Sequence, residues 1–325
     1  MKFRAILALA MLSCCAFAQW RKYIEAPATY AGFVRATVKV GEYRASGFSV
    51  EEYRQANGPG LVQRVMVAVP DGAGRKVRLP AVVVPFYFPE AMLGIDPKTG
   101  SAESPLAPPN TNLTYYGAIP YMADLARRGY ITASADAYYL TYDPENAPGD
   151  AWAKWGHVGR KLLKDHPEWP GIGKLTFDTR LLIDLLCADV RVDTNRIGII
   201  GHSLGGKMAF YAGCLDPRIK VIVASDFGIG WDQTNWQDVW YWGDRLKELR
   251  AKGMDHADLL SLAGGKPFCL IAGKYDDASS GEMMRKARGY EGHPERLLFI
   301  NHASGHRPPR SATESGYAFL DRYLK

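Results

Sequence analysis

The feature that most constrains this chain is the turn within residues 196–215, where an apolar run ends and a helical pattern begins at once. Residues 196–200 have the length and apolar content of a short buried strand, and apolar residues recur at helical spacing over 208–215. Between them, residues 201–205 read GHSLG, which matches the pattern G-x-S-x-G. The sequence therefore predicts a tight strand–turn–helix unit with Ser203 at its apex.

This spacing suits a nucleophilic serine. A serine hydroxyl attacks poorly unless a base removes its proton, and a sharp turn exposes the hydroxyl to such a base. The two backbones come so close at this turn that Gly201 and Gly205 are needed on either side. The N–H of Leu204, at the start of the helix, would then donate to an oxyanion. A phosphate loop is the alternative, because residues 201–207 also fit G-x-x-x-x-G-K, but Met208 stands where Ser or Thr would bind magnesium.

Composition narrows the class of protein. The chain has 325 residues, 47% of them hydrophobic and 23% charged, which are ordinary values for one large globular domain with insertions. Its N-terminus differs, because two basic residues precede an apolar run and a small-x-small pattern, which predicts a secretory signal peptide over residues 1–18. The run is shorter than the ~20 residues that span a bilayer, so we expect no stable membrane span. A lipoprotein anchor at Cys14 or Cys15 is a further alternative. The predicted location is secreted or periplasmic.

Charge and cysteines exclude other classes. The formal net charge is only +6, and no Lys/Arg cluster interleaved with aromatic residues occurs, so nucleic acid is not an expected partner. After the signal peptide three cysteines remain, Cys187, Cys214 and Cys269, each in an apolar stretch. An odd number argues against a disulfide framework, and we expect buried free thiols rather than one pair and one free thiol.

The rest of the chain divides into a lead-in and a catalytic domain. Residues 19–60 are aromatic-rich and irregular, and we expect them to pack on the domain formed by 61–325. Alternation from residue 61, a turn at 71–74 and an apolar run at 80–86 predict an antiparallel pair of strands. From there strands and helices alternate.

Two segments interrupt this alternation, at about 138–174 and 228–266, and they contain every tryptophan except Trp20. Tryptophans between strands are typical of a lid that lines a pocket, where they stack on a sugar or an aromatic ring. Small satellite cores beneath long loops are the equal alternative. The residues that we expect to contact substrate are Trp155, Trp231 and Trp236.

Acids and a base follow later strands. Asp226 and Asp276 each end a predicted strand, and the carboxyl ends of strands are where open α/β sheets build their sites. His306 lies between Gly305 and two prolines, just before the terminal helix, and we prefer it to His302 as the base. The chain order Ser, Asp, His is the order that a serine hydrolase on such a sheet needs. The two histidines lack a third ligand, so no metal site is expected.

The strings GHSLGGK, GKYDDAS and SGHRPP before a last helix resemble the α/β-hydrolase superfamily over residues 61–325. Within it the chain is similar to secreted esterases of the dienelactone hydrolase, acetyl xylan esterase and glucuronoyl esterase type. The resemblance implies an α/β fold with a mostly parallel central sheet, helices on both faces and Trp-rich lid insertions. Most members place the acid at the position matched by Asp276. Residues 201–228, however, resemble the glucuronoyl esterase elbow, where the acid sits at the position matched by Asp226.

The chain departs from these families at two positions. Leu204 stands where glucuronoyl esterases carry an arginine, which argues against uronate esters specifically. The strand at 80–86 also lacks the usual His-Gly after it. Because Pro85 and Pro89 have no N–H, the second oxyanion donor is expected from the backbone of Phe88 or Tyr87.

The sequence therefore predicts a secreted serine hydrolase that cleaves a carboxylic ester of a small molecule or a carbohydrate through an acyl-enzyme. Ser203 is the expected nucleophile, His306 the base, and Asp276 the acid that orients the imidazole, with Asp226 as the alternative acid. We expect no cofactor. A peptidase of the same fold and a catalytically silent binding protein are the alternatives.

Overall fold

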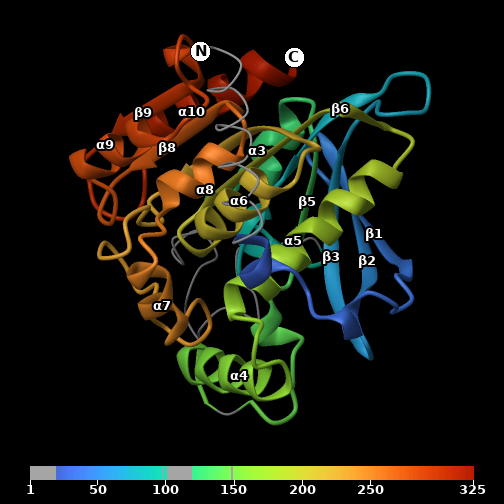
Figure 1. Cartoon of the computed structure of the whole chain (residues 1–325). Coiled ribbons are helices and arrows are strands. Elements are labelled where there is room, and N and C mark those ends of the chain that lie inside the picture. The colour runs from blue at the N-terminus through green and yellow to red at the C-terminus, as the bar shows by residue number, and fades with distance from the viewer. Residues whose placement is uncertain (1–19, 97, 101–118, 148) are drawn as a thin grey trace, which may run out of the picture.

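The computed structural model describes residues 20–96, 98–100, 119–147 and 149–325. The predicted signal peptide, residues 1–18, lies outside these ranges. Figure 1 shows a central sheet with helices packed around it, and with α4 at the lower end of the view.

A nine-stranded sheet forms the centre, in the order β1-β2-β3-β5-β4-β6-β7-β8-β9. The first three pairs in this order, β1–β2, β2–β3 and β3–β5, are antiparallel. The remaining pairs, from β5–β4 to β8–β9, are parallel. The strands are β1 (Thr37–Ala45), β2 (Phe48–Gly58), β3 (Leu61–Pro70), β4 (Leu79–Val83), β5 (Ile131–Ala135), β6 (Val192–His202), β7 (Ile219–Ser225), β8 (Phe268–Ala272) and β9 (Leu297–Asn301). The mostly parallel sheet predicted from the sequence is confirmed.

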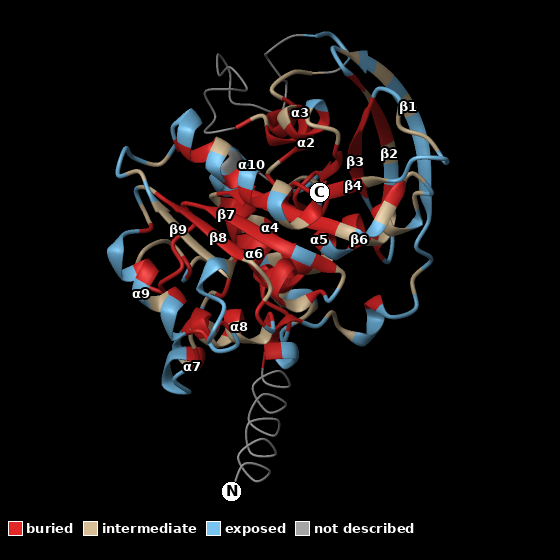
Figure 2. Cartoon of the chain, turned by 90° about the horizontal axis from the view of Figure 1, so that it is seen from above, coloured by how far each residue is buried: buried red, intermediate tan, exposed pale blue. Residues whose placement is uncertain are grey.

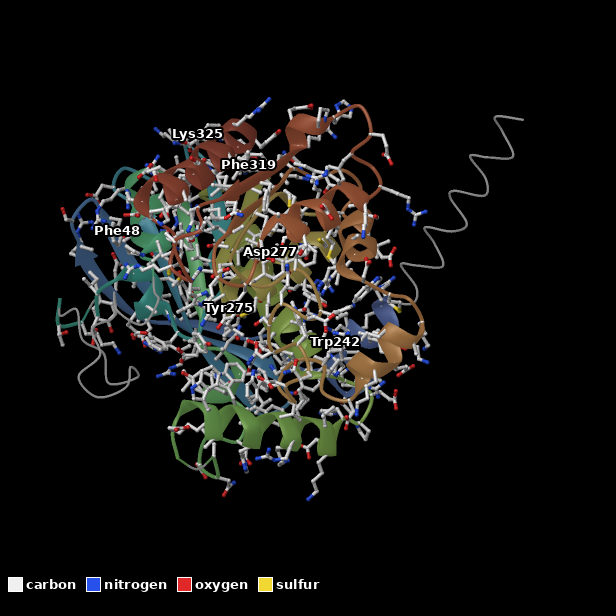
Figure 3. All side chains as sticks on the ribbon, turned by 90° about the vertical axis from the view of Figure 1, so that its left-hand side faces the viewer. Phe48, Trp242, Tyr275, Asp277, Phe319 and Lys325 are labelled. Carbon is white, nitrogen blue, oxygen red and sulfur yellow. The ribbon has the colours of Figure 1, made fainter. Side chains whose placement is uncertain are left out.

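Helices cover both faces of the sheet. The helices are α2 (Pro89–Leu93), α3 (Tyr121–Arg127), α4 (Ala151–Asp165), α5 (Gly171–Ala188), α6 (Leu204–Leu215), α7 (Arg245–Ala251), α8 (His256–Leu262), α9 (Ala278–Lys286) and α10 (Arg310–Leu324). Contacts place α5 and α6 on one face and α3 and α10 on the other, and Figure 2 shows these two layers from above. Each layer has its own apolar core, and Figure 3 shows Trp242 of the first core well away from Phe48 and Phe319 of the second.

The prediction of an irregular lead-in is wrong for much of its length, because β1 and β2 form a hairpin that continues the sheet. The edge strand β1 is exposed along most of its length, as Figure 2 shows, so it carries no alternating burial pattern. In β2 the alternation is broken by Glu51 and Glu52, which are buried as ion pairs with Arg191 and Lys98. A strand is hard to recognise from its sequence when buried positions carry charged residues whose ion-pair partners lie far away in the chain.

The predicted antiparallel pairing of the next two strands is also wrong. Strand β5 lies between β3 and β4, pairing antiparallel with β3 and parallel with β4. Residues Pro80–Val83 of β4 are buried, which requires a neighbour on each side and cover on each face. Alternation and a turn identify strands, but they do not identify the strand that pairs with them.

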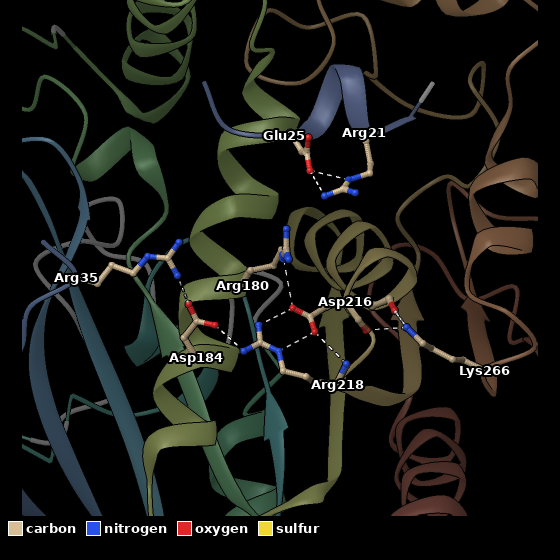
Figure 4. A network of polar contacts seen from close by, with 9 residues as sticks. Arg21, Glu25, Arg35, Arg180, Asp184, Asp216, Arg218 and Lys266 are labelled. Carbon is tan, nitrogen blue, oxygen red and sulfur yellow. Dashed lines mark hydrogen bonds and ion pairs between the residues drawn. The ribbon is translucent and has the colours of Figure 1, made fainter. Parts of the chain in front are cut away.

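A buried polar network holds the C-terminal end of α6. The carboxylate of Asp216, the C-cap residue, accepts hydrogen bonds from Arg180 and from both the backbone and side chain of Arg218. Lys266 donates to the carbonyl oxygens of Gly213 and Asp216 (Figure 4). These bonds satisfy carbonyls that a helix end leaves without partners. The far end of the helix that begins after Ser203 is therefore anchored to α5 and β8.

The prediction of buried free thiols is confirmed for Cys214 and Cys269, whereas Cys187 is only partly buried. Within the described residues all three thiols are free. Burial raises the pKa of the Cys214 thiol to about 12, which keeps it protonated and unreactive at neutral pH.

Candidate active site

The turn between β6 and α6 has the strained geometry that the motif predicts. Ser203 has φ 55° and ψ −117°, a conformation that L-residues rarely adopt. A Cβ on Gly201 would lie 2.0 Å from the carbonyl oxygen of Gly205, and one on Gly205 would lie 2.1 Å from that of Pro85. Only glycine allows the strand, the helix and the loop after β4 to approach this closely.

His306 lies beside the serine. Its Nε2 is 3.0 Å from Ser203 Oγ, and its Nδ1 is 2.5 Å from Asp226 Oδ2. His302 instead pairs within its own loop, where Nδ1 lies 2.8 Å from Ser304 Oγ. The structure thus brings together Ser203, His306 and Asp226, which come from the carboxyl ends of β6, β9 and β7.

The expectation that Asp276 pairs with His306 is wrong. Its carboxylate is buried and saturated by other donors: Gly228 N–H at 2.8 Å, Ile229 N–H at 2.7 Å and the Ser280 hydroxyl at 2.9 Å. The physical reason is backbone position, since Asp276 lies beneath the loop that follows β7 and binds that loop.

Asp226 is held by a matching set of contacts. Its Oδ1 accepts from the N–H groups of Tyr275 at 2.6 Å and Asp276 at 3.2 Å, which leaves Oδ2 for His306. The loops after β7 and β8 therefore bind each other's aspartate.

Burial would raise the pKa of Asp226, but the hydrogen bonds from His306 and the Tyr275 N–H outweigh it, and the pKa lies below its usual range. The carboxylate stays charged beside the imidazole. Figure 3 marks Tyr275, whose ring also packs edge-on against His306.

A cavity of about 680 Å³ opens at Ser203. Its walls come from the loop after β4, the start of α4 and the segment after β7, including Tyr87, Trp152 and Tyr241. Trp152 is 59% exposed at this wall, so part of its ring is open to solvent, although the ring also contacts that of Trp240. Apolar and polar groups together line a space of the size that holds a small ligand.

The expected tryptophan contacts require a correction. Trp155, Trp231 and Trp236 are buried in the first core, and none of them is among the residues that line this cavity. The indole N–H of Trp231 donates to Met254 O, and that of Trp236 to Gly228 O, so these rings are satellite core. Trp152 lines the cavity although it shares a helical face with the buried Trp155 and Val158. Sequence spacing could not separate them, because α4 begins beyond the edge of the core.

Lys207 is a cavity residue that sequence reasoning considered only as part of a phosphate loop. It lies one helical turn after Ser203, which puts both on the same face of the elbow helix. Its Nζ donates to Phe227 O at 3.0 Å and lies 4.4 Å from the centre of the Trp236 ring. Burial lowers the pKa of Lys207 to about 7, and nearby carboxylates, first Asp276, oppose this.

Of the two expected oxyanion donors, the first lies where the sequence predicts and the second differs. Leu204 is the first residue of α6, as predicted. In the loop after β4, Phe86 and Tyr87 line the cavity, whereas Phe88 is buried at the N-cap of α2 and is not among the lining residues. The candidate second donor is therefore the backbone of Phe86 or Tyr87.

Across the described ranges, no group of three or more His, Cys, Asp and Glu side chains has the arrangement of a metal site. No helix in the described part of the chain is both long and apolar enough to cross a membrane.

Comparison with solved structures identifies the architecture. A glucuronoyl esterase from Solibacter usitatus superimposes with a TM-score of 0.71 over 95% of this chain and 91% of its own, at 16% sequence identity. The chain has the α/β-hydrolase fold. The sequence resemblance to this superfamily and to its carbohydrate esterases is confirmed at the level of the fold.

Two curated proteins match parts of the sequence. YtaP of Bacillus subtilis (strain 168), named as a hydrolase, is 26% identical over 165 residues, which are 47% of this chain and 54% of YtaP. The carbohydrate esterase MZ0003, from an unknown prokaryotic organism, is 24% identical over 104 residues, 32% of this chain and 24% of its own length. The match thus spans about half of the first relative and a quarter of the second. No protein-family profile matches the chain.

Proposed function

We propose that the protein is a serine hydrolase that cleaves a carboxylic ester through an acyl-enzyme. The observation that supports this is the hydrogen-bonded series Ser203, His306 and Asp226 at the mouth of the cavity. Its distances suit transfer of the serine proton to Nε2, while the Asp226 carboxylate orients the ring and stabilises the imidazolium.

The reaction follows from these groups. Ser203 Oγ attacks the ester carbonyl as His306 Nε2 takes the hydroxyl proton, and the carbonyl oxygen becomes an oxyanion. The N–H of Leu204 and a backbone N–H of the Phe86–Tyr87 segment stabilise this charge. Collapse expels the alcohol, which receives the proton from His306. A water molecule, deprotonated by His306, then attacks the acyl-enzyme, and the acid and free Ser203 are released.

We propose a carbohydrate-linked ester as the substrate class. The exposed ring of Trp152 is a stacking surface at the cavity wall, and Asn235 and Thr234 supply hydrogen-bonding groups nearby. The names of the glucuronoyl esterase and of the carbohydrate esterase relative support the same class. The proposed location is secreted or periplasmic, on the strength of the signal-like residues 1–18.

The first test is Ser203→Ala. We expect turnover of nitrophenyl esters, acetylated xylan and a glucuronate ester to fall by up to ~10⁶-fold, because the covalent step is lost. Ser315→Ala, a serine on the exposed part of α10, is the matched control and should keep wild-type turnover. Activity above a tenth of wild type in Ser203→Ala would reject the assignment. Peptide anilides in the same assay distinguish an esterase from a peptidase.

A further inference from the structure

A buried cluster of three charges lies outside the residues described so far. Arg64, on β3, donates to both oxygens of Asp136, from Nε at 3.2 Å and from Nη2 at 2.9 Å. It also contacts both oxygens of Glu90, through Nη1 and, at 2.9 Å, through Nη2. All three side chains are buried. One guanidinium thus pairs with two carboxylates through its planar set of N–H donors. The ammonium group of a lysine could not reproduce this arrangement.

One of these three residues, Glu90, adjoins a segment that lines the cavity. Glu90 is the second residue of α2 and follows Tyr87 by three positions, while Asp136 directly follows β5. The N–H of Ala137, next to Asp136, donates to Tyr87 O at 2.9 Å, and Asp136 N–H donates to Arg64 O at 3.0 Å. The Phe86–Tyr87 segment is therefore tied to β5 through its own carbonyl and to β3 through Glu90.

The cluster depends on its arginine. Two carboxylates and one guanidinium leave an excess negative charge in a buried place. Burial raises the pKa of Asp136 to about 6, Arg64 opposes this, and Glu90 adds to it. Without the guanidinium, the two buried carboxylates would repel each other, and no positive partner would offset their loss of hydration. Glu90 lies on the short helix α2, three residues after Tyr87, so loss of the pairing would act first on the Phe86–Tyr87 segment.

We propose that Arg64, through Glu90 and Asp136, is a positioning residue that holds the Phe86–Tyr87 backbone where it donates to the oxyanion. This inference rests on the proposed ester hydrolysis. The side chain acts through the loop and leaves substrate binding elsewhere in the cavity unchanged. Its loss should therefore reduce kcat and leave KM nearly constant, because an oxyanion contact forms only in the transition state.

The test is Arg64→Met, which keeps the length of the side chain and removes its charge and donors. We expect kcat to fall about 10²- to 10³-fold, the usual loss for one oxyanion donor, with KM within about threefold of wild type. Inhibition by a trifluoromethyl ketone, which forms a tetrahedral adduct, should weaken in parallel. Asp178→Asn is the matched control, since it disrupts the buried Lys174–Asp178 pair on α5 and should lower Tm while keeping kcat.

A second readout needs no turnover. Hydrogen exchange of residues 84–93 should become faster in Arg64→Met and remain unchanged in Asp178→Asn. Equal exchange in both variants, or faster exchange with unchanged kcat, overturns the positioning role. If Arg64→Met does not fold, Glu90→Gln, which keeps the shape and weakens the pairing, should show the same effects in smaller measure. If wild-type protein cleaves no ester, the proposed function fails, and the exchange data still decide whether Arg64 holds the loop.

Discussion

At the scale of single residues, two aspartates of similar setting have different tasks. Asp226 and Asp276 each lie in the loop that follows a strand, each is buried, and each accepts backbone N–H groups from the other's loop. Only Asp226 has an oxygen beside His306 Nδ1. Its backbone, at φ 41°, is one of the few described non-glycine positions in the left-handed region, and the bonds from the Tyr275 and Asp276 N–H groups to Oδ1 leave Oδ2 for the ring. Asp276 shapes the loop that holds it.

This difference predicts unequal mutants. Asp226→Asn should reduce kcat by about 10⁴, as when a triad acid is neutralised and the imidazole adopts the wrong tautomer. Asp276→Asn should cost much less in kcat and more in stability, because a buried carboxylate that accepts three hydrogen bonds is lost. Steady-state kinetics and urea unfolding of both variants and of the double mutant check this. A larger kinetic loss in Asp276→Asn would reverse the roles.

At the scale of elements, β6, the turn and α6 form the unit that positions Ser203, the proposed nucleophile. Its two ends are fixed differently: backbone contacts pack the turn against the β4 loop, and the Asp216 network anchors the far end of the helix. The same unit places Lys207 one turn after the serine and Leu204 at the helix start. One strand–helix junction thus supplies two residues that line the cavity, Ser203 and Lys207, and the proposed oxyanion donor Leu204.

Gly201→Ala tests this packing. An added Cβ would lie 2.0 Å from the Gly205 carbonyl oxygen, so we expect a loss of about 3 kcal/mol or more in the free energy of unfolding. Turnover should drop with it. Gly74→Ala is the control, because nothing lies within 4 Å of its Cβ position, and it should change stability by less than about 0.5 kcal/mol. A folded, fully active Gly201→Ala protein would show that the turn is looser than described.

At the scale of the whole molecule, the segment after β7 is supported from far away in the sequence. Trp20 is buried and packs against Trp231, Trp242 and His256, with Tyr211 of α6 as a further neighbour. The beginning of the described chain therefore helps to form the core beneath the cavity wall. Lys207 belongs to the same region, and its burial couples the stability of the whole fold to pH.

The coupling has a definite sign. Lys207 has a pKa of about 7 in the fold, compared with about 10.4 in an unfolded chain. Between these values the unfolded state binds a proton that the folded state lacks, so folding is favoured as pH rises from 7 towards 10. Relative to Lys207→Met, wild-type stability should increase by up to about 1.4 kcal/mol per pH unit. Lys247→Met, at an exposed lysine of α7, should show no such difference in urea titrations. A constant difference between pH 7 and 9.5 would contradict the burial effect.

The sequence by itself determined the elbow, the later strands that lead to the site, and the residue types of the site. These features depend on local spacing, since a turn this tight admits glycine at only certain positions, and periodic apolar residues mark buried strands and helices. Ser203 and His306 could be chosen in this way because their neighbours, GHSLG and the proline-rich segment, are distinctive over a few residues.

Only the tertiary structure decided between residues, or between strands, that look equivalent in the sequence. Asp226 and Asp276 look alike in sequence, and the distance to His306 separates them. Trp152 and Trp155 share a helical face, and the edge of the core separates them. The partner of β4, the strands within 20–60 and the Arg64 cluster likewise depend on residues far apart in the chain. A local sequence pattern indicates which role a residue could have. Contacts between distant segments decide which of several such residues lies at the site.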